Sequence, residues 1–155
     1  MRTDSFSYGI DVQCSADEAM ALMSDFHRHR GLNPYLVEVR ELPAAPGAVR
    51  SFAISDRLRW GPFAFRTTYR ADILTRTDRQ VITVARQWPR TTLRNHTTVT
   101  DTGDGMVHIG AHITFTAPKL LFGYGFRTAQ AVHEGLSQRL RNTLERSPGD
   151  GDPDR

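Results

Sequence analysis

Four polar side chains between residues 69 and 97 interrupt apolar rows, and they are well suited to hold the oxygens of a ligand. Each falls on the more apolar face of a segment whose residues alternate with period two. An unpaired polar group on a buried face costs several kcal/mol. Two interpretations follow: each group has an internal partner, or the groups surround a wet cavity that binds a small molecule. The four residues are Tyr69, Arg86, Asn95 and Thr97.

One histidine of the chain, His133, has apolar neighbours on its predicted helical face. His133 falls at helical spacing with Ala129, Leu136 and Leu140, so it lies on an apolar stripe. Such a residue is either a satisfied core histidine or a general acid/base, and it is the best candidate for proton transfer in the chain. Asp56 is the one acid expected on an inward strand face, so a pair of catalytic carboxylates is not predicted.

Other chemistry finds little support in the sequence. The single cysteine, Cys14, excludes an internal disulfide and a cysteine-cluster zinc site. His96, His108 and His112 fall on one face of a predicted hairpin, but that row is the polar outer one. We therefore expect exposed histidines rather than metal ligands. Gly-x-Ser-x-Gly, phosphate-loop and dinucleotide motifs are missing, and we predict neither a metal nor a redox cofactor.

The segments that must position these residues are predicted from hydrophobic period and turn residues. A first strand covers residues 6–12, and Ser15 with Glu18 forms a capping box that starts a helix. A short helix or turn follows and stops at Gly31 and Pro34. The connections after it are too short for parallel crossovers, so the later strands should pair antiparallel. These strands are expected at 35–42, 49–59, 63–74, 80–88, 91–100 and 106–117.

The last long segment, from Pro118 to Arg146, has the 3.6-residue period of an amphipathic helix from Phe126 onward. Its first part, LLFGYGF, contains two glycines and is expected to be a flexible entrance. A helix that follows a run of strands must lay its apolar stripe on their sheet. The order predicts a single α+β domain over residues 1–146, with a cavity under the helix and a disordered tail at 147–155.

Alternation also assigns the residues of each strand to a face. With 101–105 as a turn, Val99 lies opposite Val107 and Asn95 opposite Ala111, and both rows face inward. The same reasoning turns Arg86 and Trp88 inward on the preceding strand, together with Ile82 and Val84. Broad aromatic surface from Trp60 and Trp88 would then wall the cavity. The predicted ligand-binding residues are Trp60, Trp88, Asn95, Thr97, Phe126 and Ala129.

The composition of the chain argues against two classes of partner, nucleic acids and membranes. The net charge is +3 and the pI about 9.5, but nineteen of the twenty basic residues are arginines scattered among acids, which is unlike a nucleic-acid patch. No apolar run has the length of a membrane span, and the N-terminus lacks the apolar core of a signal peptide. We therefore expect a cytoplasmic protein without nucleic acid or stable membrane insertion, as a monomer or weak homodimer.

The order of elements over residues 5–146 resembles the START/Bet v 1-like superfamily, whose fold is called helix-grip. The resemblance is carried by the strand FSYGIDVQC running into SADEAMALMSDF, by the Asn33-Pro34 break before a strand, by the meander and by the terminal helix AVHEGLSQRLRNTLE. Within the superfamily it is similar to the bacterial polyketide cyclase/dehydrase and lipid-transport group. It implies a seven-stranded curved antiparallel sheet and a small hydrophobic or polyketide-like ligand in the cavity.

Three functions are compatible with this resemblance. A cofactor-independent cyclase/aromatase would use Arg86 and Tyr69 to polarise a carbonyl and His133 to move a proton. A carrier or sensor would hold a lipid or quinone without reaction. An interaction module would resemble the ribosome-associated toxin branch of the superfamily and need no ligand.

Overall fold

The computed structural model describes residues 1–145, apart from the side chain of Trp60. The predicted tail at 147–155 lies outside the described residues.

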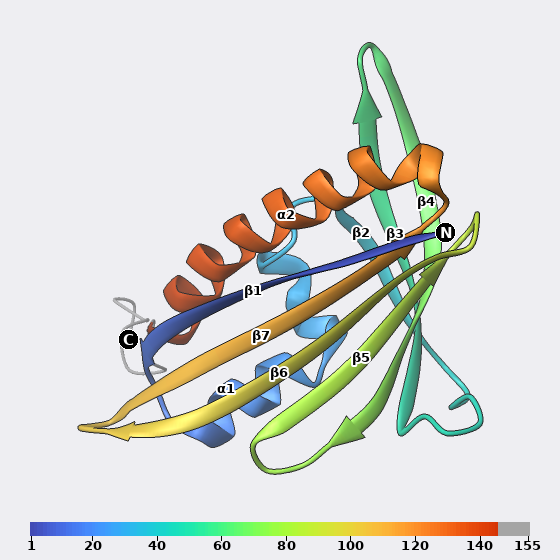
Figure 1. The fold of residues 1–155 in the computed structure, drawn as a ribbon. Helices are drawn as coiled ribbons and strands as arrows, with labels where there is room; N and C mark the ends of the chain where they lie inside the picture. The colour runs from blue at the N-terminus through green and yellow to red at the C-terminus, as the bar shows by residue number, and fades with distance from the viewer. Residues whose placement is uncertain (146–155) are drawn as a thin grey trace, which may run out of the picture.

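A seven-stranded antiparallel sheet forms one layer of the molecule. Its spatial order is β1-β7-β6-β5-β4-β3-β2, so each meander strand pairs with its neighbour in sequence and β1 closes on β7 (Figure 1). This is the architecture that short connections predict. The strands are β1 (Arg2–Gln13), β2 (Leu36–Leu42), β3 (Arg50–Trp60), β4 (Phe63–Arg76), β5 (Gln80–Gln87), β6 (Thr91–Gly103) and β7 (Met106–Ala117).

Three helical segments complete the domain. The helix α1 (Ala16–Met23) begins at the predicted capping box, in which the Ser15 hydroxyl accepts from the Glu18 amide at 3.1 Å and the Glu18 carboxylate accepts from the Ser15 amide at 3.2 Å. The short 3-10 helix η1 (Phe26–Gly31) follows, and the long helix α2 (Lys119–Glu145) ends the described chain. The expected α+β helix-grip architecture is confirmed.

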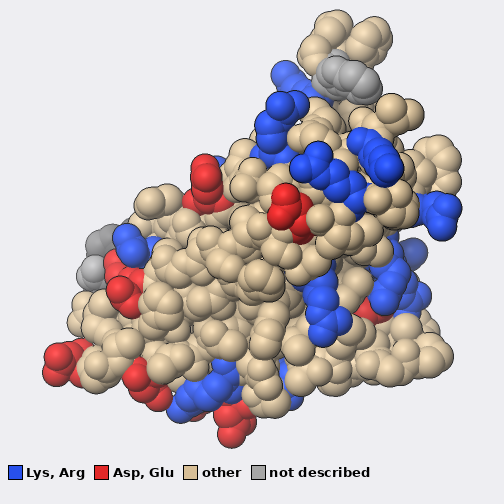
Figure 2. Space-filling view, in the orientation of Figure 1, with Lys and Arg blue, Asp and Glu red and all other residues tan. Residues whose placement is uncertain are grey.

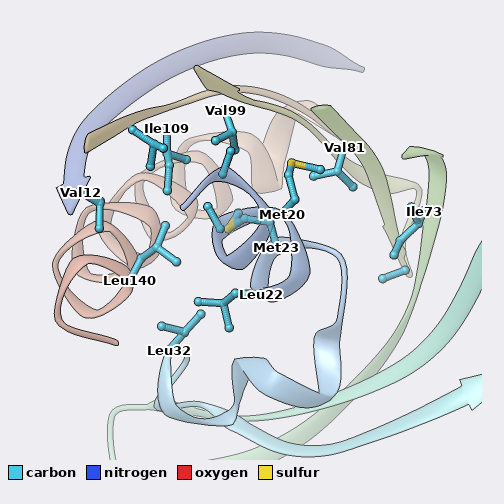
Figure 3. Packing of buried hydrophobic residues seen from close by; sticks show 14 of the residues in the cluster. Val12, Met20, Leu22, Met23, Leu32, Ile73, Val81, Val99, Ile109 and Leu140 are labelled. Atoms are coloured by element: carbon cyan, nitrogen blue, oxygen red, sulfur yellow. The ribbon is translucent and has the colours of Figure 1, made fainter. Parts of the chain in front are cut away.

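The main core lies at one end of the sheet, where α1 and the C-terminal part of α2 meet the strands. Figure 3 shows Met20 and Leu22 of α1 among side chains from the strands and Leu140 of α2. A second, smaller core lies at the other end, where α2 begins. Its buried members are Phe115, Ala117, Phe122 and Ala129.

The last hairpin has a different register from the predicted one. The strand β6 runs on to Gly103, so the turn is tighter than 101–105, and Val99 lies opposite Ile109 rather than Val107. Asn95 pairs with Ile113 instead of Ala111, and Thr97 pairs with Ala111 instead of Ile109. Because the shift is an even number of residues, the predicted inward face of β6 is still correct.

The predicted face of β5 is wrong. A bulge in β4 lies between Ile73, which pairs with Thr83, and Thr75, which pairs with Ile82. One extra residue on one strand reverses which side chains share a face beyond that point. The inner row of β5 is therefore Val81, Thr83, Ala85 and Gln87, which lie beside the inner residues of β6, while Ile82, Val84 and Arg86 face outward.

The beginning of α2 also differs from expectation. The helix starts at Lys119, so LLFGYGF forms its first two turns rather than a flexible entrance. Phe122 is buried there against Phe115, with ring centroids 5.6 Å apart, and stacks on Phe126 at 5.2 Å. These aromatic contacts explain why a segment with two glycines remains helical. None of the helices described here is long and apolar enough to cross a bilayer.

Candidate functional site

The candidate site is the space between the inner face of the sheet and α2, and small residues form its floor. Ala71 of β4 pairs with Ala85 of β5, and Thr83 is the next inward residue on β5. Ala85 and Thr83 are only half-buried although they face the interior. Both positions carry small side chains that stay partly accessible to solvent, so packing does not close off this part of the inner face.

α2 forms one wall with the residues of its inner stripe. Phe126 is half-buried and packs edge-on against Phe6 of β1, with ring centroids 5.6 Å apart, and Ala129 is buried beside it. Both predicted ligand-binding residues of α2 therefore lie on the side of the helix that faces β1 and β7. The helix approaches the sheet closely at Gly125, where a Cβ would come within 2.6 Å of the Phe115 ring.

His133 and Tyr8 form a first polar group in the interior. His133 is only 9% exposed, and its ring lies 5.7 Å from those of Phe6 and Tyr8. Its Nδ1 atom and the Tyr8 hydroxyl are both buried without a hydrogen-bond partner among the described residues. Burial lowers the pKa of His133 to about 4 and raises the pKa of Tyr8 to about 12, so both are neutral at pH 7.

Asp56 and Tyr69 form a second polar group on another part of the wall. Asp56 of β3 and Tyr69 of β4 face inward on neighbouring strands, as the alternation predicts. Burial raises the pKa of Asp56, and a hydrogen bond from the Tyr69 hydroxyl opposes that rise only in part. Burial and the nearby Asp56 charge raise the pKa of Tyr69 in turn. The Oδ1 atom of Asp56 is buried and has no partner in the described chain.

Asn95 and Thr97 face the interior from β6. Thr97 is fully buried, and its hydroxyl donates to the Asn95 side-chain oxygen at 2.9 Å. Asn95 is half-buried beside Thr83 of β5. Thr97 therefore has an internal partner, as one interpretation of the sequence predicted, while Asn95 borders the open floor.

Arg86 does not reach the interior. It lies on the outer face of the sheet, where its guanidinium donates to Asp72 Oδ2 at 2.8 Å and its side chain is half exposed. Arg70 and Ser51 bind the other oxygen of Asp72, at 2.9 and 2.6 Å. Hence Arg86 has a structural partner rather than an interior ligand, and the bulge in β4 is the reason that sequence alternation misplaced it.

The two tryptophans were predicted to form walls of the cavity, and the structure describes the side chain of Trp88 but not that of Trp60. Trp88 follows the end of β5 in the turn before β6, and its side chain is 89% exposed. It therefore lies outside the interior, contrary to the predicted inward face. The backbone of Trp60 ends β3, but its side chain lies outside the described part of the structure, and its predicted role stays a prediction.

The three histidines of the outer face have separate partners. His96 bonds Gln80 at 2.8 Å, His108 bonds Asp11 at 2.9 Å, and His112 bonds Ser7 at 2.7 Å. His96 lies opposite His112, not opposite Gly110 as the predicted register implied. Among the described residues, no group of three or more His, Cys, Asp or Glu side chains is arranged to hold a metal ion.

A groove of about 470 Å³ runs along the edge of α2 that faces the η1–β2 loop. Its lining combines aromatic, basic and small residues, and Val132 of α2 is half-buried there. The volume lies in the range of small-molecule sites. The lining residues are Pro34, Tyr35, Tyr124, Arg127, Thr128, Ala131, Val132, Gly135 and Arg139.

Comparison with known proteins defines the fold. The di-domain ARO/CYC StfQ from the steffimycin biosynthetic pathway superposes with a TM-score of 0.74 at 16% identity, over 92% of this chain and 51% of that one. The aromatase/cyclase Zhui from a Streptomyces species gives 0.69 at 13% identity, over 97% and 100% of the two chains. A START superfamily protein from Mycobacterium smegmatis gives a TM-score of 0.68 at 14% identity, over 91% of this chain and 97% of that one.

These likenesses assign the chain to a structural class. No family model matches the sequence, and no curated protein matches it. The chain spans about half the length of the di-domain protein. At identities this low the superpositions establish the fold, which is the helix-grip fold of the START and Bet v 1-like proteins that the sequence resemblance predicted.

Proposed function

We propose that the protein binds a small, largely apolar molecule with several oxygens, of the aromatic or polyketide type, between the inner face of the sheet and α2. The observation that carries this proposal is that three of the four buried polar atoms without partners among the described residues belong to the candidate site: His133 Nδ1, the Tyr8 hydroxyl and Asp56 Oδ1. Leaving such atoms unsatisfied costs free energy, and the oxygens of a ligand would recover it. The small floor residues and aromatic walls supply room and apolar contact.

The chemical character of these groups suits a cyclisation. A neutral imidazole at pH 7 can accept a proton from a carbon between two carbonyls, and the resulting enolate can attack a second carbonyl of the same molecule. The attacked carbonyl becomes an alkoxide, which takes the proton back from the imidazolium. The Tyr8 hydroxyl, which lies beside His133 and has no partner among the described residues, would donate a hydrogen bond to the carbonyl oxygen on which charge develops. This replaces the role first expected of Arg86. The fold shared with two aromatase/cyclases favours this chemistry without establishing it.

A non-catalytic carrier of a lipid or quinone is the second candidate. One observation favours it: the polar groups form two separate sets, with His133 beside Tyr8 on α2 and β1, and Asp56 beside Tyr69 on β3 and β4. Separate sets can fix two ends of an extended ligand without acting on one bond. The START superfamily protein shares the same fold.

Native mass spectrometry of the chain purified from its own host tests the proposal. We expect a fraction of the protein to carry one small molecule, and solvent extraction followed by accurate mass would give its elemental composition. An oxygen-rich aromatic molecule altered on incubation supports the cyclase, whereas one that is recovered unchanged supports the carrier. If the protein carries no molecule and also fails to bind hydroxylated polycyclic aromatics added to it, the proposed function is wrong.

A further inference from the structure

Large apolar side chains are exposed together at the end of the molecule where α2 begins. Phe63, next to the turn between β3 and β4, is 73% exposed, Trp88 in the β5–β6 turn is 89% exposed, and Leu120 in the first turn of α2 is 99% exposed. Phe65 and Tyr124 belong to the same region and are 44% and 56% exposed. The three connections belong to the same end of the sheet, because antiparallel neighbours bring alternate connections together (Figure 1). We call these five residues the apolar end.

Basic residues surround the apolar end, and acids are scarce there. The chain has no Asp or Glu between Asp56 and Asp72, between Asp78 and Asp101, or between Asp104 and Glu134. Those stretches contain the three connections of the apolar end. Figure 2 shows Lys and Arg side chains gathered around the projecting β3–β4 hairpin on the face in view. The exposed basic residues near the apolar end are Arg57, Arg59, Arg66, Arg90, Lys119 and Arg127.

Most of this charge has no acidic partner. Arg66 pairs with Glu38 of β2, and among the described residues it is the one member of the basic set that forms an ion pair. The opposite end has the reverse character, with Asp78 and Asp104 in its turns and Asp101 near the end of β6. The charge is therefore distributed unevenly, with basic residues at one end of the molecule and acidic residues at the other. The basic end is also the end with protruding apolar side chains.

We propose that the apolar end docks on an anionic lipid surface, with Phe63, Trp88 and Leu120 entering the interface and the surrounding arginines and lysine contacting the headgroups. Protruding side chains on separate turns fit a fluid interface, which adapts to them, better than a protein partner, which must offer a pocket for each. Aromatic and aliphatic side chains beside Arg and Lys match the apolar and charged layers of such a surface. This proposal does not depend on the proposed ligand or reaction.

Sedimentation of the full chain with lipid vesicles tests the docking. We expect binding to phosphatidylcholine vesicles that contain phosphatidylserine, no binding to pure phosphatidylcholine, and weaker binding as salt is raised. In a Trp60→Phe background Trp88 is the one tryptophan, and its emission should shift to the blue on binding. Failure to bind the anionic vesicles at low salt would overturn the proposal.

Substitutions separate the apolar from the charged contribution. Leu120→Ser should weaken binding about tenfold, since a fully exposed leucine loses its burial in the interface. Each of Arg57→Gln and Arg59→Gln should weaken it about fivefold. The matched controls lie at the opposite end: Val49→Ser, at a residue that is 57% exposed, and Arg79→Gln should leave binding unchanged.

Two further results would contradict the docking. If the arginine variants weaken binding while Leu120→Ser and the emission of Trp88 do not respond, the basic end recognises a soluble polyanion, such as an acidic protein, and not a bilayer. If Val49→Ser weakens binding as much as Leu120→Ser, the apolar end has no special role. The variants of Leu120, Arg57, Arg59, Val49 and Arg79 replace exposed side chains, so circular dichroism should show an unchanged fold.

Discussion

Asp72 shows how one residue of the outer face can bind side chains that the sequence alone suggests are functional. It is 4% exposed although it lies on the outer face, and Ser51, Arg70 and Arg86 all donate to it. Burial opposes its charge, but the hydrogen bonds from Ser51 and Arg70 outweigh that effect and lower its pKa. Arg86 is thus explained by a structural network, and the interior loses its only predicted cation.

His133 should make the stability of the protein depend on pH. The unfolded chain binds a proton on this histidine near pH 6.5, whereas the folded protein resists protonation until about pH 4. Acid therefore favours the unfolded state: the contribution of His133 is fully present above pH 6.5 and is lost as the pH falls toward 4. Between pH 7 and pH 4 the loss amounts to about 3 kcal/mol.

Urea unfolding of wild type and His133→Leu across this range measures the effect. The wild type should lose about 3 kcal/mol more unfolding free energy than the variant, which has no imidazole to protonate. The variant is needed as a reference because burial also lowers the pKa of His29. His29 therefore also makes both proteins less stable in acid, and the difference between the two proteins isolates His133. Equal pH dependence in the two proteins would mean that His133 is solvated in the folded state.

At the scale of elements, the beginning of α2 is a packed aromatic contact. Two glycines in its first turns differ in their surroundings. A Cβ on Gly125 would lie 2.6 Å from the Phe115 ring, while a Cβ on Gly123 would have no atom within 4 Å. One glycine is required by close packing and the other is not.

A pair of alanine substitutions tests this account of α2. Gly123→Ala should stabilise the protein by up to about 1 kcal/mol, because alanine favours the helix. Gly125→Ala should instead destabilise it by about 1–2 kcal/mol, since overpacking against Phe115 exceeds the same helical gain. Chemical denaturation of both variants provides the values. Equal stabilisation by the two would show that α2 does not approach β7 as closely as described.

The elements were largely predictable and their exact pairing was not. Period, turn residues and the capping box at Ser15 located every strand and helix, because these signals are local. The bulge near Leu74 in β4 has no such signal, and it reversed the predicted face of β5. The larger residues Ile82 and Val84 also favoured the wrong face, since a floor with room for a ligand is less apolar than a packed core.

The candidate site could be predicted in part for the same reason. Tyr69, Asn95 and Thr97 face the interior as strand alternation indicated, and His133 does so as its helical spacing indicated, because no irregularity interrupts these parts of their segments. Tyr8 falls within the predicted first strand, but nothing in the sequence indicated that its hydroxyl would lack a partner beside His133. That property depends on contacts between the first strand and the last helix, which are far apart in the chain.

At the scale of the whole molecule, the two ends of the sheet differ in packing, in exposed apolar side chains and in charge. One end holds the main core beneath α1, with acidic turns outside it. The other end carries a smaller aromatic core, exposed apolar side chains and basic residues. Between them lies a floor of small residues bordered by buried polar atoms. Such a division would let one end stabilise the domain while the middle and the other end provide the proposed ligand site and the proposed docking surface.

Binding of the fluorescent probe 1-anilinonaphthalene-8-sulfonate to variants of the sheet tests the central claim, that this floor is the bottom of a ligand cavity. Ala85→Trp fills the space above the floor, and Thr98→Trp places the same side chain on the exposed outer face of β6 as a matched control. We expect saturable binding by wild type and by Thr98→Trp, and about tenfold weaker binding by Ala85→Trp with an unchanged fold. Equal affinity in all three proteins would contradict the account.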